Sequence, residues 1–276
     1  MVVSAPEHGS NMNLKLVKAS QGLVWVRQGV LACRKQPLGF IGLLGLVGTV
    51  ALLLLSLPEQ MGALFVGVMP LVWMGFMLAT RRALAGERIT PAVMIEAIKQ
   101  PDSPRLAFAQ LGGAYILATL LVMQIAQWLG PDPEALDTIR KAAKDAAELI
   151  TNPLVQQDML WRAALTIPVS LIFWHTPALV LWARMPVGKA LFFSAYATWR
   201  NLGAFIVYGA SWLGILIVAG LLDRLLMLLI PIPAAADVIA VIAGMWLAGA
   251  FYASLYFTVV ACFDAPPKSA PTDAAA

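Results

Sequence analysis

The sequence predicts an all-α polytopic membrane protein, and two observations carry this prediction. Hydrophobic residues make up 60% of the 276 residues, and charged residues make up 12%, about half of the roughly 25% found in soluble domains. The apolar residues also form six continuous stretches, each near the roughly 20 residues that a helix needs to cross a bilayer. A membrane barrel is excluded, because its strands alternate apolar and polar residues over about ten positions.

The six predicted spans cover about 38–57, 61–80, 106–129, 160–183, 202–222 and 237–263. Only Pro58-Glu59-Gln60 separates the first two spans, which predicts a tight hairpin. A cleaved signal peptide has a short apolar core near its start, so we interpret the first span as a retained helix. We expect one membrane domain over 14–263, with disordered tails at 1–13 and 264–276.

Basic residues predict the orientation of the spans. Cytoplasmic loops of membrane proteins carry an excess of Lys and Arg. Of the 19 basic residues, 14 fall in the N-terminal segment, 81–105, 184–201 and the C-terminal tail, all on one side of the predicted membrane. Both termini are therefore expected in the cytoplasm of a bacterial inner-membrane protein. This asymmetry also explains the basic net charge without a nucleic-acid partner.

Three amphipathic segments are expected on the cytoplasmic side, at 14–35, 90–100 and 186–199. A basic amphipathic helix beside a span is typical of the headgroup region. The same face could instead pack on the cytoplasmic ends of the bundle, and the two arrangements are compatible. We expect Trp25, Arg34, Lys35, Arg200 and Asn201 at this interface.

These segments suggest a three-fold repeat of one interfacial helix followed by a transmembrane pair. The units would cover about 14–80, 90–183 and 186–263. The sequence Arg34-Lys35-Gln36-Pro37-Leu38-Gly39-Phe40 resembles Arg200-Asn201-Leu202-Gly203-Ala204-Phe205. Parallel repeats about an axis along the membrane normal are a known arrangement.

The loop at 130–159 predicts a short surface helix that caps the bundle. Asp132 is a good N-cap, and Pro133 suits the first turn. The pairs Asp137–Lys141 and Lys144–Glu148 are spaced i,i+4. Thr151-Asn152-Pro153 is expected to end the helix.

The fourth span contains the residues that most suggest a cavity or a gate. His175 is the one ionisable residue well inside a predicted span, and Pro168 and Pro177 should kink its helix. Gln124 and Gln127 in the third span could face the same polar path or bond to a neighbouring helix. The alternative is that His175 only holds the kink by bonding a freed carbonyl.

Catalytic chemistry has little support in this sequence. We find no phosphate-binding loop, no HExxH pair and no plausible Ser/His/Asp set, so we assign no catalytic, cofactor or metal residues. Cys33 and Cys262 are expected to be free thiols. Small residues, including Gly209, Ser211 and Gly214 in the fifth span, are expected to allow close helix packing.

The sequence resembles an uncharacterised family of predicted integral membrane proteins from β-proteobacteria. The resemblance spans most of 17–263 and implies an inner-membrane location, but it brings no activity, cofactor or ligand. It is carried by Trp25 and Gly29 with Arg34-Lys35-Gln36-Pro37-Leu38, by Gly67, Pro70-Leu71 and Gly75, by Phe173-Trp174 and Pro177-Ala178-Leu179-Val180, and by Lys189-Ala190-Leu191, Ser194 and Arg200-Asn201.

Three functions remain open from the sequence. The leading hypothesis is a non-enzymatic component that binds lipid or another membrane protein, or forms a homo-oligomer, in a scaffolding, assembly or envelope role. The second is a small transporter or channel that uses the kinked fourth span. The third is a membrane enzyme that acts on lipid.

Overall fold

The computed structural model describes residues 13–56, 59–99, 101–230 and 232–263. Apart from an isolated bridge between Leu14 and Phe263, the regular structure of these residues is helical. The helices are α1 (Gln21–Lys35), α2 (Pro37–Leu55), α3 (Glu59–Ala85), α4 (Val93–Lys99), α5 (Arg105–Leu129), α6 (Pro133–Ala142), α7 (Ala146–Thr151), α8 (Pro153–Phe173), α9 (Thr176–Trp182), α10 (Val187–Arg200), α11 (Leu202–Leu229) and α12 (Pro233–Cys262).

Six helical stretches within the described residues are long and apolar enough to cross a membrane, which confirms the all-α polytopic fold. They are formed by α2, α3, α5, α8 continued by α9, α11 and α12. The bounds differ from the prediction at several ends, and two differences are the largest. The fourth stretch starts at Pro153 instead of 160, because the Asn152 side chain accepts a hydrogen bond from the Leu154 amide at 3.0 Å and caps α8. The fifth continues past 222, because Asp223-Arg224 lowers the hydropathy without breaking α11.

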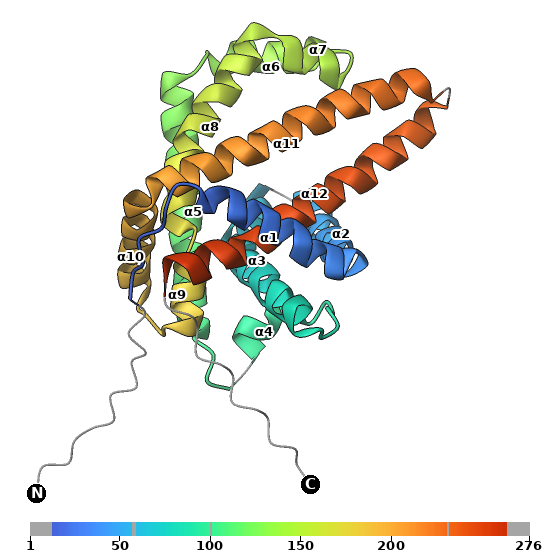
Figure 1. Cartoon of the computed structure of the whole chain (residues 1–276). Helices are drawn as coiled ribbons and strands as arrows, with labels where there is room; N and C mark the ends of the chain where they lie inside the picture. The colour runs from blue at the N-terminus through green and yellow to red at the C-terminus, as the bar shows by residue number, and fades with distance from the viewer. Residues whose placement is uncertain (1–12, 57–58, 100, 231, 264–276) are drawn as a thin grey trace, which may run out of the picture.

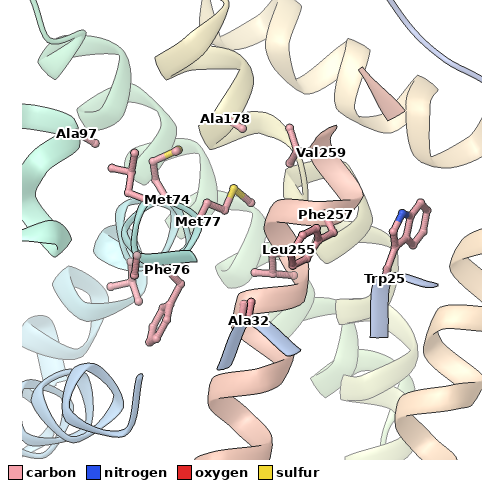
Figure 2. Close-up of a cluster of buried hydrophobic side chains, with 14 of the residues drawn as sticks. Trp25, Ala32, Met74, Phe76, Met77, Ala97, Ala178, Leu255, Phe257 and Val259 are labelled. Atoms are coloured by element: carbon pink, nitrogen blue, oxygen red, sulfur yellow. The ribbon is translucent and has the colours of Figure 1, made fainter. Parts of the chain in front are cut away.

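The two ends of the described chain meet at one end of the bundle, which we call the proximal end. The Lys15 amide donates to the Cys262 carbonyl at 2.7 Å, beside the bridge between Leu14 and Phe263. The opposite, distal end carries α6 and α7 (Figure 1). Much of the core lies toward the proximal end, with side chains from α1, α3, α4, α9 and α12 (Figure 2). Farther out, the α11–α12 hairpin diverges from α5 and α8 (Figure 1).

The amphipathic helices pack onto the bundle. Two glycines let α1 approach its neighbours closely: a Cβ on Gly22 would lie 2.3 Å from the Ala204 carbonyl oxygen, and one on Gly29 would lie 2.5 Å from the Ser254 Cβ. Trp25, between them, is completely buried. This corrects the expectation that Trp25 lies at the headgroup interface, because the face of α1 that carries it is covered by α11 and α12.

The first amphipathic helix is also shorter than predicted. It begins at Gln21 instead of 14, because the preceding residues are extended and bond to other parts of the chain. The second, α4, packs on α3, where Met94 fills the space over Gly75. The third, α10, packs on α8 and α9.

The order of the helices agrees with the predicted three units: α1–α2–α3, α4–α5–α8/α9 and α10–α11–α12. The contacts add a pattern that the sequence did not reveal. Each amphipathic helix packs on the second span of the unit before it: α4 on α3, α10 on α8/α9 and, closing the circle, α1 on α12. The units are therefore linked in a ring at the proximal end.

The distal loop forms two short helices instead of the single predicted one. Asp132 caps α6 as expected, and its side chain accepts from the Glu134 amide at 3.2 Å. The chain then becomes extended at Ala143, and Asp145 caps α7. The predicted Asp137–Lys141 pair forms at 2.6 Å. Glu148 instead accepts from the Lys144 backbone amide at 3.0 Å, because the break prevents an i,i+4 pair on one helix.

Candidate functional site

A long apolar groove lies between α11 and α12. Its volume is about 1460 Å³, larger than the roughly 300–1,000 Å³ of typical small-molecule pockets. Its walls are mostly Leu, Ile, Val, Ala and Gly side chains of α11 and α12, and it is open along one side. Leu23 and Val26 of α1 line it at the proximal end, and Leu229 lines it at the distal end. The groove therefore runs along most of the hairpin.

Glycines form part of the walls of this groove. Gly214, Gly220 and Gly244 line the groove, and a Cβ on any of them would meet nothing within 4 Å. The prediction that Gly209 and Gly214 allow close helix packing is therefore wrong, since both face open space. The close approaches occur instead at glycines such as Gly22 and Gly29. Hydropathy could not distinguish these two uses of glycine.

Two polar side chains, Ser211 and Asp223, line the otherwise apolar groove. The Ser211 hydroxyl donates to the Val207 carbonyl of its own helix at 2.5 Å, so its bonding is local. The Asp223 carboxylate has no such partner: its buried Oδ1 oxygen receives no hydrogen bond from any described residue. Asp223 comes directly after the predicted fifth span, which ended at 222, so nothing in the sequence singled it out as a site residue.

A cluster of aromatic side chains lies beside the proximal end of the groove, and it brings together two residues singled out in the sequence. The Phe205 ring is 5.2 Å from the Trp25 ring and 5.6 Å from the His175 ring, measured between centroids. Tyr208 continues the cluster, and its hydroxyl lies 2.6 Å from the Ser254 hydroxyl. These contacts join α1, the α8–α9 break, α11 and α12 in one core.

His175 is completely buried at the break between α8 and α9. Its backbone amide donates to the Ser194 hydroxyl of α10 at 3.0 Å. Neither ring nitrogen has a hydrogen-bond partner among the described residues, and the ring packs edge-on against Phe205 and Phe263. The hydrogen bond at the break between α8 and α9 is therefore made by the backbone amide of His175 to Ser194, while the imidazole ring packs in the core.

The other residues of the predicted gate do not join His175 around a cavity. Pro177 is buried in the first turn of α9, whereas Pro168, Gln124 and Gln127 are exposed on the outside of α8 and α5. None of these residues lines the groove. Helical period places Gln124 and Gln127 on the outward face of α5, because Val122 and Ala126 occupy the buried face.

The predicted interfacial residues divide into exposed cations and buried groups. Arg34, Lys35 and Arg200 are exposed, and the Arg200 guanidinium lies 6.0 Å from the Tyr196 ring centroid. Asn201 is buried, contrary to the interfacial expectation. Its side chain accepts from the Val17 amide at 2.8 Å and donates to the Lys15 carbonyl at 3.0 Å. Position at a helix joint, not hydropathy, determines the role of Asn201.

Both cysteines are free thiols, as predicted, and both are buried. Burial raises the pKa of the Cys33 thiol to about 11, because the thiolate would lose its hydration. Cys33 lies on α1, and its sulfur contacts the Trp246 carbonyl at 3.8 Å beside the groove. Within the described residues, no three His, Cys, Asp or Glu side chains gather as metal ligands would.

Comparison with known proteins provides the family. The chain is 32% identical over 266 residues to a Burkholderia thailandensis protein named "Probable inner membrane protein", and the match covers 94% of this chain and 97% of the relative. The chain belongs to the family of that protein. It is a multi-pass protein of the inner membrane, as the resemblance implied. No family model and no solved structure matches the chain.

Proposed function

We propose that this protein is a non-enzymatic lipid-binding component of the inner membrane, and that the groove between α11 and α12 holds the acyl chains of a bound phospholipid. The observation that carries this proposal is the groove itself. Its walls are apolar and belong to two membrane-spanning helices, so an occupant has to match the hydrocarbon region. Acyl chains satisfy this requirement without any polar contact.

The proposed orientation places the proximal end in the cytoplasm. The helix ends and loops described at that end carry most of the basic residues, including Arg34, Lys35, Arg88 and Arg200. The distal end of the groove then opens at the outer leaflet. A lipid would enter the groove sideways from that leaflet, with its chains directed toward α1.

The proposed site predicts which substitutions abolish binding. Phe at Gly214 and Gly244 would fill the groove, since the space around both positions is open and no backbone has to move. Gly209→Phe is a matched control, because Gly209 is also open and also lies on α11 but does not line the groove.

The experiment uses the full chain reconstituted in phosphatidylethanolamine vesicles that contain a trace of the same lipid with a diazirine at the end of one acyl chain. After photolysis, labelled peptides are identified by mass spectrometry. We expect labels on α11 and α12 in the wild type and in Gly209→Phe, and their loss in the Gly214→Phe/Gly244→Phe variant. Equal labelling of these helices in all three proteins would overturn the proposal.

A further inference from the structure

The carboxylate of Asp223 gives the groove a polar position near its distal end, about 9 Å along the helix before Leu229. Asp223 lies within the fifth membrane-spanning stretch and lines the groove, where most of its neighbours are apolar. An ionisable side chain within a span is costly unless a partner neutralises it. No described residue pairs with its carboxylate: the α12 residues that line the groove, between Ile239 and Leu247, carry no charge.

The position of Asp223 along α11 suits contact with a lipid headgroup. Helical rise separates Leu202, at the start of α11, from Asp223 by about 31 Å, close to the roughly 30 Å thickness of the hydrocarbon region. Asp223 therefore lies near the end of the apolar length of α11, where a bound lipid would place its headgroup. The groove continues from there toward Leu23 and Val26, along apolar walls.

The charges at this depth suggest the class of headgroup. Asp223 supplies an anion in the groove, and Arg224, next on the helix, supplies an exposed cation outside the groove lining. A zwitterionic headgroup with an ammonium and a phosphate complements both charges, whereas an anionic headgroup would be repelled by Asp223. Charge-assisted hydrogen bonds between an ammonium and a carboxylate are also stronger than neutral ones.

We infer that the groove selects an aminophospholipid, whose ammonium group binds the Asp223 carboxylate while its acyl chains fill the space between α11 and α12. This inference rests on the proposed function and adds the lipid class to it. A site with one charge-assisted contact of this kind should prefer the amine headgroup by about tenfold.

The test compares two photoactivatable lipids that share the same diazirine acyl chain, one with an ethanolamine and one with a glycerol headgroup. Each is added in trace amount to vesicles of equal phosphatidylethanolamine and phosphatidylglycerol content that hold the full chain. Asp223→Asn keeps the size of the side chain and removes its charge. Asp237→Asn is the control, because Asp237 is an exposed carboxylate in the first turns of α12 that does not line the groove.

We expect the wild type and Asp237→Asn to be labelled about tenfold more by the ethanolamine lipid than by the glycerol lipid. Asp223→Asn should be labelled by both to a similar extent, with labels still on α11 and α12. Equal labelling of the wild type by both lipids, or an unchanged preference in Asp223→Asn, would refute the headgroup inference. The lipid-binding proposal would survive those results as long as filling the groove removes the label. Labelled adducts between two protein chains would instead show that a second copy occupies the groove, and would refute both.

Discussion

The side-chain amides of Gln36 and Asn201 make the same pair of hydrogen bonds at two different helix joints. Gln36, between α1 and α2, donates to the Glu87 carbonyl at 2.5 Å and accepts from the Ile89 amide at 2.9 Å. Asn201, between α10 and α11, donates to the Lys15 carbonyl and accepts from the Val17 amide, at 3.0 and 2.8 Å. Each side-chain amide thus binds the carbonyl oxygen of one residue and the backbone N–H of the residue two positions later in an extended segment.

These two clamps have the same place in the ring of units. The segment held by Gln36 leads into α4, and the segment held by Asn201 leads into α1, so each clamp links one unit to the amphipathic helix of the next. At the third joint, the Arg184 guanidinium donates to the Asp102 carbonyl. The sequence Lys99-Gln100-Pro101 repeats Lys35-Gln36-Pro37, but Gln100 lies outside the described residues.

Asn201→Leu should destabilise the protein by about 3 kcal/mol, because it leaves the Val17 amide and the Lys15 carbonyl without the Asn201 side chain. The free energy of unfolding, measured by titration with sodium dodecyl sulfate in mixed micelles, checks this value. Gln127→Leu removes an exposed amide and should change the stability by less than about 0.5 kcal/mol. Similar effects of the two substitutions would contradict the clamp.

Gly22→Ala should displace α1, because the added Cβ would come 2.3 Å from the Ala204 carbonyl oxygen. Overpacking of this kind costs about 1–3 kcal/mol. The matched substitution Gly209→Ala meets no atom within 4 Å and should raise the stability by up to about 1 kcal/mol through helix propensity. Thermal unfolding in detergent distinguishes the two, and a stable Gly22→Ala protein would argue against tight packing of α1 on α11.

His175→Leu should leave the stability unchanged or raise it, because no described residue bonds the imidazole nitrogens. Ser194→Ala should instead cost about 1 kcal/mol, since the hydroxyl accepts from the His175 backbone amide. The free energy of unfolding of both variants provides the test. A large decrease in the free energy of unfolding of His175→Leu would show that the ring has a hydrogen-bond partner and would support a polar role for this side chain.

The Cys33 thiol should make the protein less stable between pH 9 and pH 11. The thiol ionises near its ordinary pKa of 9.0 in the unfolded chain and near 11 in the folded protein, so the unfolded state binds fewer protons in this interval. The contribution of the buried thiol to the free energy of unfolding is therefore fully present below pH 9, and it declines as the pH rises toward 11. Unfolding in a Cys262→Ala background, compared with Cys33→Ala/Cys262→Ala, measures the difference; parallel pH profiles would refute the raised pKa.

The spans illustrate how much of the fold could be predicted from the sequence. Hydropathy located all six membrane-spanning stretches, because each must be apolar over a length set by the bilayer. Cap residues such as Asp132 were equally predictable from the sequence, since their hydrogen bonds are local. The length of α11 was underestimated, because charged residues at the end of a span reduce hydropathy while the backbone continues as a helix.

The candidate site was much less predictable. His175 was singled out for its chemistry, but the structure buries its ring among aromatic side chains. Trp25 and Asn201 were predicted to lie at the membrane interface, but both are buried inside the protein. Asp223 and the glycines of the groove carried no distinctive motif, because a groove exists only where two helices fail to touch.

The sequence by itself determined that this protein is a helical membrane protein with six spans and three amphipathic segments, because these properties depend on the solvent that each residue prefers. Only the tertiary structure decided that α1 closes a ring of three units, that Gln36 and Asn201 clamp the segments leading into α4 and α1, and that α11 and α12 separate to leave an apolar groove. These features depend on contacts between residues that are distant in the chain, and hydropathy and local spacing do not encode such contacts.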